Sequence, residues 1–255
     1  MVPDYVLKSV LGSIDGDWTR TVDGGWVHKT ATVGNKATVG HGATVGDGAT
    51  VGDGATVGRR ATVGYDTMVG NEAVVGKWAM VGYKVTIGDH ATIGEGSKVG
   101  FDSMVGNGAR VENGAMVGYK VTVGDGTIVG YTTTVGNRTM IGNGATIGDG
   151  VKIGNGATIG HKATIGHGVI IRDDALIGDE ATFQESPVYI FGSTYPVYHS
   201  NKRKITIGCK SHSVDYWLNN YREIGERAKF SDDKILEYKA YIDLVASADL
   251  RIFPD

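Results

Sequence analysis

A repeat of six residues governs the middle of this chain. Every sixth residue from Val33 to Phe183 is Val, Ile or Phe, without a slip or an insertion. The residue that follows is Gly except at Glu112, Arg172 and Gln184, and the residue two places earlier is Ala, Ser, Thr or Val. A short, fixed period of this kind indicates stacked structural repeats, each of which is too small to bury its apolar side alone.

The unit Ala49-Thr50-Val51-Gly52-Asp53-Gly54 shows how one repeat is expected to fold. Ala and Val lie two residues apart, so they face the same side of an extended segment, and Thr faces the other side. Gly and the two residues after it suit a tight corner. Such strands bury their apolar row by coiling into a prism in which successive coils form a parallel ladder. Collagen is excluded because it needs Gly at every third position and much Pro, and the chain has 4 Pro.

Over residues 27–185 this pattern resembles the hexapeptide-repeat, left-handed parallel β-helix superfamily, whose scaffold is that of many acyltransferases. The resemblance implies three strands in each coil. The fold class that follows is all-β: a left-handed parallel β-helix of about eight to nine coils, with a small C-terminal module of strands and two helices. The resemblance says little about function, because many activities share this scaffold.

Three parts of the chain are expected. Residues 1–26 are rich in aromatic side chains and form an N-terminal cap, and residues 27–185 form the β-helix. Residues 186–255 form the C-terminal module, with strands in 186–212, helices in 213–246 and a tail. Ser213 is expected to cap the first helix and Gly225 to end it. Around Ile207-Gly208-Cys209 and Glu237-Tyr238 the module loosely resembles uncharacterised phage and prophage proteins.

The composition limits where the protein works and what it binds. The chain has a net charge of −3 and 1 Cys, which predicts no intrachain disulfide and fits a reducing compartment. No apolar run approaches the roughly 20 residues of a membrane span, and the first residues lack the layout of a signal peptide. We therefore expect a cytoplasmic protein (host cytoplasm if the chain is phage-encoded) that binds neither membranes nor long nucleic acids.

Residues eighteen apart are expected to stack on adjacent coils, so outward columns can be read from the sequence. One column contains Asn and Asp in alternation and predicts a ladder of stacked turns. A second column is aromatic and is flanked by outward Met residues. An outward apolar strip needs a cover, and related β-helices commonly form threefold assemblies. The strip therefore predicts the interface of a homotrimer, although ligand stacking stays open: Tyr65, Met68, Met80, Tyr83, Phe101, Met104, Met116 and Tyr119.

A third corner combines cations with an aromatic ring, at Arg59, Arg60, Lys77 and Trp78. Such a set can bind an anion that carries a stackable ring, and it can equally be a solvated corner. After the coils a second polar cluster is a candidate ligand site: Tyr195, Tyr198, His199, Lys202, Arg203, Lys204 and His212. Cys209 is expected to be a small buried hydrophobe, since Cys209 and His212 alone make a poor metal site.

Histidines at the corners of the coils are the candidates for a catalytic role. Acyltransferases of the superfamily typically use a His as general base, and the acyl carrier is often coenzyme A. The corner histidines His41, His90, His161 and His167 are candidates, with His161 and His167 preferred. Many such enzymes also have a loop that interrupts the coils and reaches a neighbouring subunit, and this repeat has none. A zinc site of the carbonic anhydrase type is disfavoured because His161 and His167 fall on different corners, and ice binding because the outward Thr rows are broken.

The main prediction is therefore a non-catalytic homotrimer, without metal or cofactor, that binds a small phosphorylated or nucleotide-like ligand. Sequestration of a host-defence signal by a phage protein is one concrete form of this prediction. The first alternative is an acyltransferase that uses acetyl-coenzyme A, with His161 or His167 as the base. The second is a structural fibre or virion component.

Overall fold

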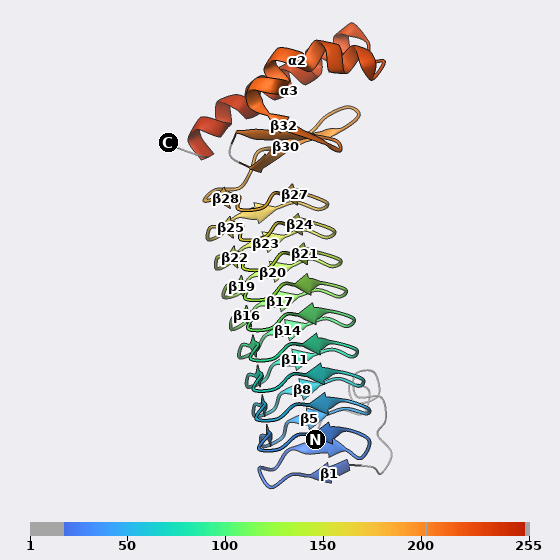
Figure 1. Cartoon of the computed structure of the whole chain (residues 1–255), viewed down its shortest axis with the longest axis vertical. Coiled ribbons are helices and arrows are strands. Elements are labelled where there is room, and N and C mark those ends of the chain that lie inside the picture. The colour runs from blue at the N-terminus through green and yellow to red at the C-terminus, as the bar shows by residue number, and fades with distance from the viewer. Residues whose placement is uncertain (1–17, 202, 253–255) are drawn as a thin grey trace.

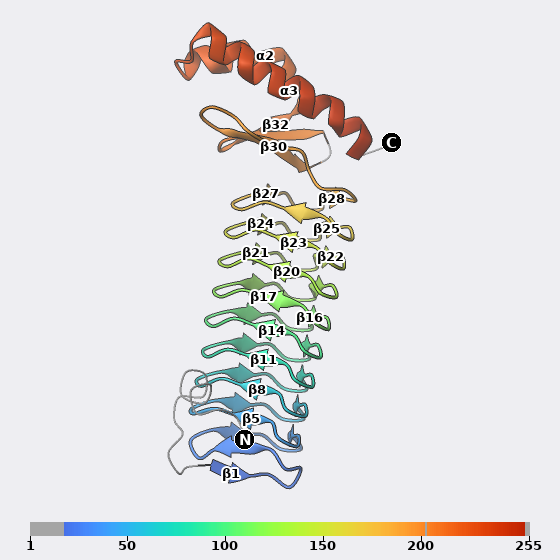
Figure 2. The same ribbon diagram turned by 180° about the vertical axis from the view of Figure 1, so that it is seen from behind.

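The protein is a rod of stacked coils with a small mixed module at its C-terminal end (Figure 1). The computed structural model describes residues 18–201 and 203–252. The same arrangement is seen from behind in Figure 2, where the module again lies beyond the last coil. Among the described residues, no helix combines the length and the apolar character needed to cross a lipid bilayer.

Three sheets form the sides of the rod, and the chain visits them in turn. Sheet I contains, in hydrogen-bonded order, β1 (Trp18–Arg20), β2 (Trp26–His28), β5 (Thr44–Val45), β8 (Thr62–Val63), β11 (Met80–Val81), β14 (Lys98–Val99), β17 (Met116–Val117), β20 (Thr134–Val135), β23 (Lys152–Ile153) and β26 (Ile170–Ile171). Sheet II contains β3 (Thr32–Val33), β6 (Thr50–Val51), β9 (Met68–Val69), β12 (Thr86–Ile87), β15 (Met104–Val105), β18 (Thr122–Val123), β21 (Met140–Ile141), β24 (Thr158–Ile159) and β27 (Leu176–Ile177). Sheet III contains β4 (Thr38–Val39), β7 (Thr56–Val57), β10 (Val74–Val75), β13 (Thr92–Ile93), β16 (Arg110–Val111), β19 (Ile128–Val129), β22 (Thr146–Ile147), β25 (Thr164–Ile165) and β28 (Thr182–Phe183).

The register is parallel with an offset of eighteen residues, so each coil contains three hexapeptides. Thr50 of β6 pairs with Met68 of β9, for example, and Thr86 of β12 pairs with Met104 of β15. The exception is β1, which pairs with β2 in the antiparallel direction. The predicted N-terminal cap falls largely on residues 1–17, which lie outside the described residues.

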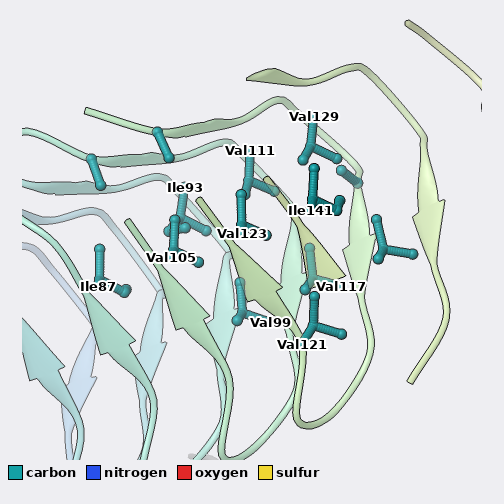
Figure 3. Packing of buried hydrophobic residues seen from close by; sticks show 14 of the residues in the cluster. Ile87, Ile93, Val99, Val105, Val111, Val117, Val121, Val123, Val129 and Ile141 are labelled. Carbon is teal, nitrogen blue, oxygen red and sulfur yellow. The ribbon is translucent and has the colours of Figure 1, made fainter. Parts of the chain in front are cut away.

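The inward positions of the repeat fill the prism. Ala49 and Val51 are fully buried, whereas Thr50 between them is exposed. Figure 3 shows Val and Ile side chains of successive coils, such as Val105 and Val123, meeting inside the sheets. A single apolar core runs from Val39 to Phe183, because every coil adds the same two kinds of inward side chain.

The repeated Gly is required by the coil that follows. A Cβ atom on Gly124 would lie 2.6 Å from the backbone nitrogen of Asn143 and 2.7 Å from the carbonyl carbon of Gly142. A Cβ so close to a neighbouring backbone would force a local shift, and the repeat has a side chain at this place only at Glu112, Arg172 and Gln184. The spacing between coils therefore selects Gly at this position of the unit.

The C-terminal module has its own sheet and its own core. Its antiparallel sheet is formed by β29 (Tyr189–Phe191), β30 (Pro196–Asn201), β31 (Lys204–Ile207) and β32 (Lys210–Ser213). Two helices, α2 (Val214–Arg227) and α3 (Asp232–Ile252), pack on this sheet and on each other. The module continues the rod, because Gly178 N after β27 donates a hydrogen bond to Ser200 O of β30 at 3.0 Å.

Two expectations about the helices need correction. Ser213 caps α2 as predicted, since its hydroxyl accepts a hydrogen bond from Tyr216 N at 3.1 Å. Gly225 does not end α2, however. It is buried inside the helix, and a Cβ there would lie 2.6 Å from Cγ1 of Ile235, so Gly allows α2 and α3 to approach closely. The second helix also extends to Ile252, six residues beyond the expected end at 246.

Candidate functional site

The outward side chains of the rod are organised by its three corners. We name these by the sheets that they join: corner I–II, corner II–III and corner III–I. Each corner holds two residues per coil, and the second takes a left-handed conformation, with φ of 55° at Glu72, 54° at Trp78 and 58° at His90. Residues at equivalent places on successive coils form columns, and these columns contain the candidate sites.

Corner II–III carries the predicted ladder of stacked turns. In each step the side chain of one coil accepts a hydrogen bond from the backbone N–H of the coil before it. Asn35 N donates to Asp53 Oδ1 at 2.7 Å, and Asp53 N donates to Asn71 Oδ1 at 2.9 Å. The ladder satisfies backbone donors that no strand pairs, which confirms a structural role for this Asn and Asp column.

The two histidines preferred as catalytic bases are steps of such ladders. Asn143 N donates to His161 Nδ1 at 3.0 Å, and Asp149 N donates to His167 Nδ1 at 3.0 Å. His167 Nδ1 also lies 3.4 Å from Asp149 Oδ2, but the backbone contact is shorter. An imidazole whose Nδ1 accepts a hydrogen bond carries its proton on Nε2 when neutral. Nε2 is then a donor, so neither ring is arranged as a general base.

His90 has the opposite arrangement. Its Nδ1 lies 3.3 Å from Oε2 of Glu72, one coil earlier in the same column of corner II–III. A carboxylate beside Nδ1 favours the proton on that nitrogen and leaves Nε2 as an acceptor. Both side chains are about two-thirds exposed (66% and 69%), so Nε2 is accessible from outside the prism. The sequence placed His90 among the candidates but did not single it out. The signal was the spacing of eighteen residues from Glu72.

The basic cluster lies on corner III–I, across sheet III from His90. Arg59 and Arg60 follow β7, and Lys77 and Trp78 follow β10 on the next coil. No salt bridge or side-chain hydrogen bond is recorded for these three cations among the described residues. Trp78 is 46% exposed. The structure therefore brings the four predicted residues together as an exposed group of cations beside an aromatic ring.

The aromatic column on corner I–II forms a continuous stack. The rings of Tyr65, Tyr83, Phe101 and Tyr119 are nearly parallel, with centroids 4.7, 4.9 and 4.9 Å apart. Exposed Met side chains flank the stack on both sides, at Met68, Met104 and Met140 on sheet II and at Met80 and Met116 on sheet I. This confirms the outward strip that the sequence predicted, and its role as a subunit interface stays a prediction.

The candidate residues after the coils do not form one site. Tyr198 and His199 are buried in β30, and Arg203 pairs with both carboxylate oxygens of Asp215 at 3.1 Å. The ring of His212 packs against Tyr216 at 4.3 Å. Lys204 is exposed on β31, Tyr195 is nearly half exposed, and Lys202 lies outside the described residues. Cys209 is exposed, contrary to the prediction, because it lies in the turn between β31 and β32.

A cleft that the sequence did not reveal separates the last coil from the module. It encloses about 730 Å³ and has Arg172, Asp174, Tyr189 and Tyr198 among its walls. The Arg172 guanidinium lies 5.9 Å from the ring centre of Tyr189 and also faces Phe191. Burial and the charge of Asp174 raise the pKa of Tyr189, and burial raises the pKa of Tyr198. The available signal was Arg172 itself, one of the three residues that stand where the repeat has Gly. Cations and carboxylates are balanced in this cleft, so it favours neither sign of ligand charge.

No three His, Cys, Asp or Glu side chains among the described residues converge in a way that could hold a metal ion.

Comparisons with known proteins agree with this architecture. A family model described as the GMPPB C-terminal domain matches residues 48–138, and one described as the bacterial transferase hexapeptide (six repeats) matches residues 132–167. No curated protein sequence matches the chain.

Two solved structures show the same fold. The UDP-N-acetylglucosamine acyltransferase of Francisella novicida is 14% identical, with a TM-score of 0.61, over 84% of this chain and 77% of that one. LpxA, the UDP-N-acetylglucosamine acyltransferase of Bacteroides fragilis, is 18% identical, with a TM-score of 0.56, over 92% of this chain and 85% of that one. The repeat and these comparisons show that the chain has the hexapeptide-repeat, left-handed β-helix fold. It shares its scaffold with acyltransferases.

Proposed function

We propose that the chain forms a homotrimer and transfers an acyl group to a hydroxyl or amine of a nucleotide-linked acceptor. The observation that carries this proposal is the contact of 3.3 Å between His90 Nδ1 and Glu72 Oε2. This contact gives His90 the tautomer that a general base needs. The scaffold shared with two UDP-N-acetylglucosamine acyltransferases supports the reaction class and the kind of acceptor.

In this reaction His90 Nε2 takes the proton from the acceptor as its oxygen or nitrogen attacks the thioester carbonyl of acetyl-coenzyme A. The C–S bond then breaks, and the coenzyme A thiolate leaves with the proton returned by the imidazolium. Glu72 orients the ring and stabilises its positive charge, as the carboxylate of a catalytic triad does. A positioned base of this kind contributes about 10²- to 10⁴-fold in rate.

The alternation of outward Met and Thr along sheets I and II supports a trimer in which corner I–II of each subunit lies at the threefold axis. With that corner at a threefold axis, sheet I of one subunit faces sheet II of the next at the same level. Thr62 then faces Met68 of the partner subunit, and Met80 faces Thr86 of the partner subunit. Met116 faces Thr122 of the partner subunit in the same way. At these three levels a long side chain therefore meets a short one, which favours close packing, whereas Lys98 meets Met104 of the partner subunit at the level between the last two.

The same arrangement explains how two separate polar columns form one site. The outer rim of each groove between subunits joins corner II–III of one subunit to corner III–I of its neighbour. His90 and Glu72 then face Arg59, Arg60 and the Lys77–Trp78 pair of the partner subunit, within one coil in height. The cations bind the phosphates of the acceptor and Trp78 stacks on its ring, while His90 reaches the acceptor hydroxyl or amine.

The test measures release of coenzyme A from acetyl-coenzyme A with a panel of nucleotide-linked sugars, followed by mass spectrometry. His90→Asn keeps a residue that tolerates positive φ, and we expect it to lower kcat at least 100-fold without loss of binding. Lys77→Ala is expected to raise KM for the acceptor with a smaller change in kcat. His161→Asn preserves the turn ladder and serves as the control with unchanged turnover. Turnover that persists in His90→Asn would exclude His90 as the base.

A second candidate function is non-catalytic binding or sequestration of a nucleotide-like ligand at the same grooves. It is favoured by the cations beside the exposed ring of Trp78, which have no salt bridge to any described residue, and by the absence of any loop that interrupts the repeat between Val33 and Phe183. The loose similarity of the module to phage proteins supports a phage protein that removes a defence signal. Native mass spectrometry separates the two functions, because a retained nucleotide without turnover supports sequestration.

A further inference from the structure

The C-terminal module contains a partly open cavity of its own, far along the rod from His90. It measures about 160 Å³ and lies between the β31–β32 turn and the two helices. Its walls are almost entirely apolar or aromatic. They include Ile207 from β31, Trp217, Tyr221 and Ile224 from α2, Phe230 from the helix connection, and Ile235, Tyr238 and Ile242 from α3.

Two of the polar side chains in these walls, Trp217 and Tyr238, have hydrogen-bond partners. Trp217 Nε1 donates to Ile205 O at 2.8 Å. The Tyr238 hydroxyl donates to Tyr195 O at 2.9 Å and accepts from Thr194 N at 3.0 Å. The walls are therefore largely apolar, and a cavity of this kind favours an apolar guest. A cavity of about 150 Å³ lined by such residues is large enough for benzene.

The walls are also held in place before any ligand enters. The rings of Phe230 and Tyr238 lie 5.4 Å apart, and Tyr195 stacks on Phe230 at 6.1 Å. Gly225 lets α2 and α3 meet closely below the cavity, where Ile235 fills the contact. A space that is rigid in the free protein binds its guest without a large entropic cost of ordering.

The mouth of the cavity is polar and positively charged. Cys209 and Lys210 of the β31–β32 turn belong to its lining, and both are exposed. No ion pair is recorded for the Lys210 ammonium among the described residues. Lys234 Nζ lies 5.2 Å from the ring centre of Phe230, but it is not part of the lining, and it donates to Thr194 Oγ1 at 2.7 Å.

We propose that this cavity is a second ligand site, for a small amphipathic monocarboxylic acid. The apolar body, of about six to eight carbon atoms, fills the space between α2, α3 and the β31–β32 turn. The carboxylate stays at the mouth, beside Lys210. The site is independent of the proposed acyl transfer and lies in a different part of the chain.

The test uses hexanoate and benzoate as probes, with hexan-1-ol and hexylamine as their neutral and cationic counterparts. Cys209 is the single cysteine of the chain and lies at the mouth of the cavity. Its rate of alkylation therefore reports whether the cavity is occupied. Both acids are expected to slow alkylation of Cys209 in a saturable way, with hexan-1-ol weaker and hexylamine weakest. Preference for one acid distinguishes a chain-shaped from a ring-shaped guest. Calorimetric titration measures each affinity directly.

Three variants complete the test. Ile224→Trp fills the cavity and is expected to abolish binding of every probe, and Ile207→Phe replaces it if Ile224→Trp fails to fold. Lys210→Met is expected to weaken the acids about threefold to fivefold, as loss of an exposed ion pair does, and to leave hexan-1-ol unchanged. Lys162→Met, on a corner of the coils, is the matched control without effect. The proposal is overturned if no probe binds, if Ile224→Trp binds as well as the original chain, or if hexylamine binds as tightly as hexanoate.

Discussion

The coils and the C-terminal module bury their apolar cores in opposite ways. In the coils, small side chains such as Ala49 and Val51 recur at fixed places, and each coil pairs with its neighbours in the same register. In the module, large residues such as Trp217 and Tyr238 pack between a sheet and two helices. A repeated unit makes a rigid surface with columns of outward residues. A unique packing of large residues leaves a partly open space. The contrast separates a part with a repeated outer surface from a part with a cavity.

The largest effect is expected when the module loses its central side chain. Trp217 is buried and donates a hydrogen bond to Ile205 O, so Trp217→Ala is expected to cost about 3–5 kcal/mol. The module should unfold while the coils stay folded. Limited proteolysis should then remove residues after about 186, and circular dichroism should lose its helical signal and keep its strand signal. Trp26→Ala, at an exposed Trp on β2, is the control. Simultaneous loss of both signals would show that the two regions fold as one unit.

A smaller effect is expected from one added methyl group between coils. Gly124→Ala places a Cβ against the backbone of Asn143 and Gly142, and such overpacking costs about 1–3 kcal/mol. Urea unfolding of the coils should therefore shift to a lower midpoint. Gly126→Asn is the matched control on the same corner, because its φ of 63° suits Asn and no atom lies within 4 Å of the added Cβ. Equal midpoints for the two variants would contradict the packing argument.

A smaller loss of stability is expected when a histidine of the turn ladder is replaced, and this replacement tests the structural role of the ring. His161→Ala removes the acceptor for Asn143 N and is expected to cost about 0.5–1.5 kcal/mol. His161→Asn supplies Oδ1 in the same place, as the other members of the column do, and should retain the stability of the original chain. Thermal unfolding measures both variants. If His161→Asn is as unstable as His161→Ala, the ring does more than accept this hydrogen bond.

The smallest expected effect is a pH-dependent change in the stability of the module. Hydrogen bonds from the Ser193 hydroxyl and backbone N–H lower the pKa of Glu237, which ties the loop before β30 to α3. A lowered pKa gives stability that is present above the ordinary glutamate pKa of about 4.3 and is lost as the pH falls through the lowered value. Glu237→Gln should thus lower the melting temperature of the module slightly at neutral pH and not at all in strong acid. A difference that persists in acid would assign the effect to packing.

The sequence predicted the coils well because each of their contacts follows from one period. The core positions, the corners, the column of Tyr65, Tyr83, Phe101 and Tyr119 and the Asn and Asp ladder all follow from a spacing of six or eighteen. Prediction was poorer where contacts join unlike segments. Gly225 looked like a helix end, but its role depends on Ile235, ten residues away in another helix. Cys209 looked like a core residue, but the turn between β31 and β32 exposes it.

The candidate sites divide in the same way. The six-residue period alone was enough to predict that Arg59 and Trp78 lie close together. The choice among the corner histidines needed the direction of each ring, because His161 and His90 differ in which atom faces Nδ1. The cleft at Arg172 and the cavity beside Lys210 are shaped by the way the module packs, and no spacing in the sequence encodes them.

The six-residue period by itself determined a prism of parallel coils, since the inward positions of each unit are apolar and Gly recurs where successive coils approach closely. It also determined which outward residues stack, because a regular rod repeats every position at a fixed height. The tertiary structure decided which atom faces Nδ1 of each corner histidine, and it formed the cavity between α2 and α3. These features depend on distances between segments that are not related by the repeat, and such distances are set only when large side chains pack in three dimensions.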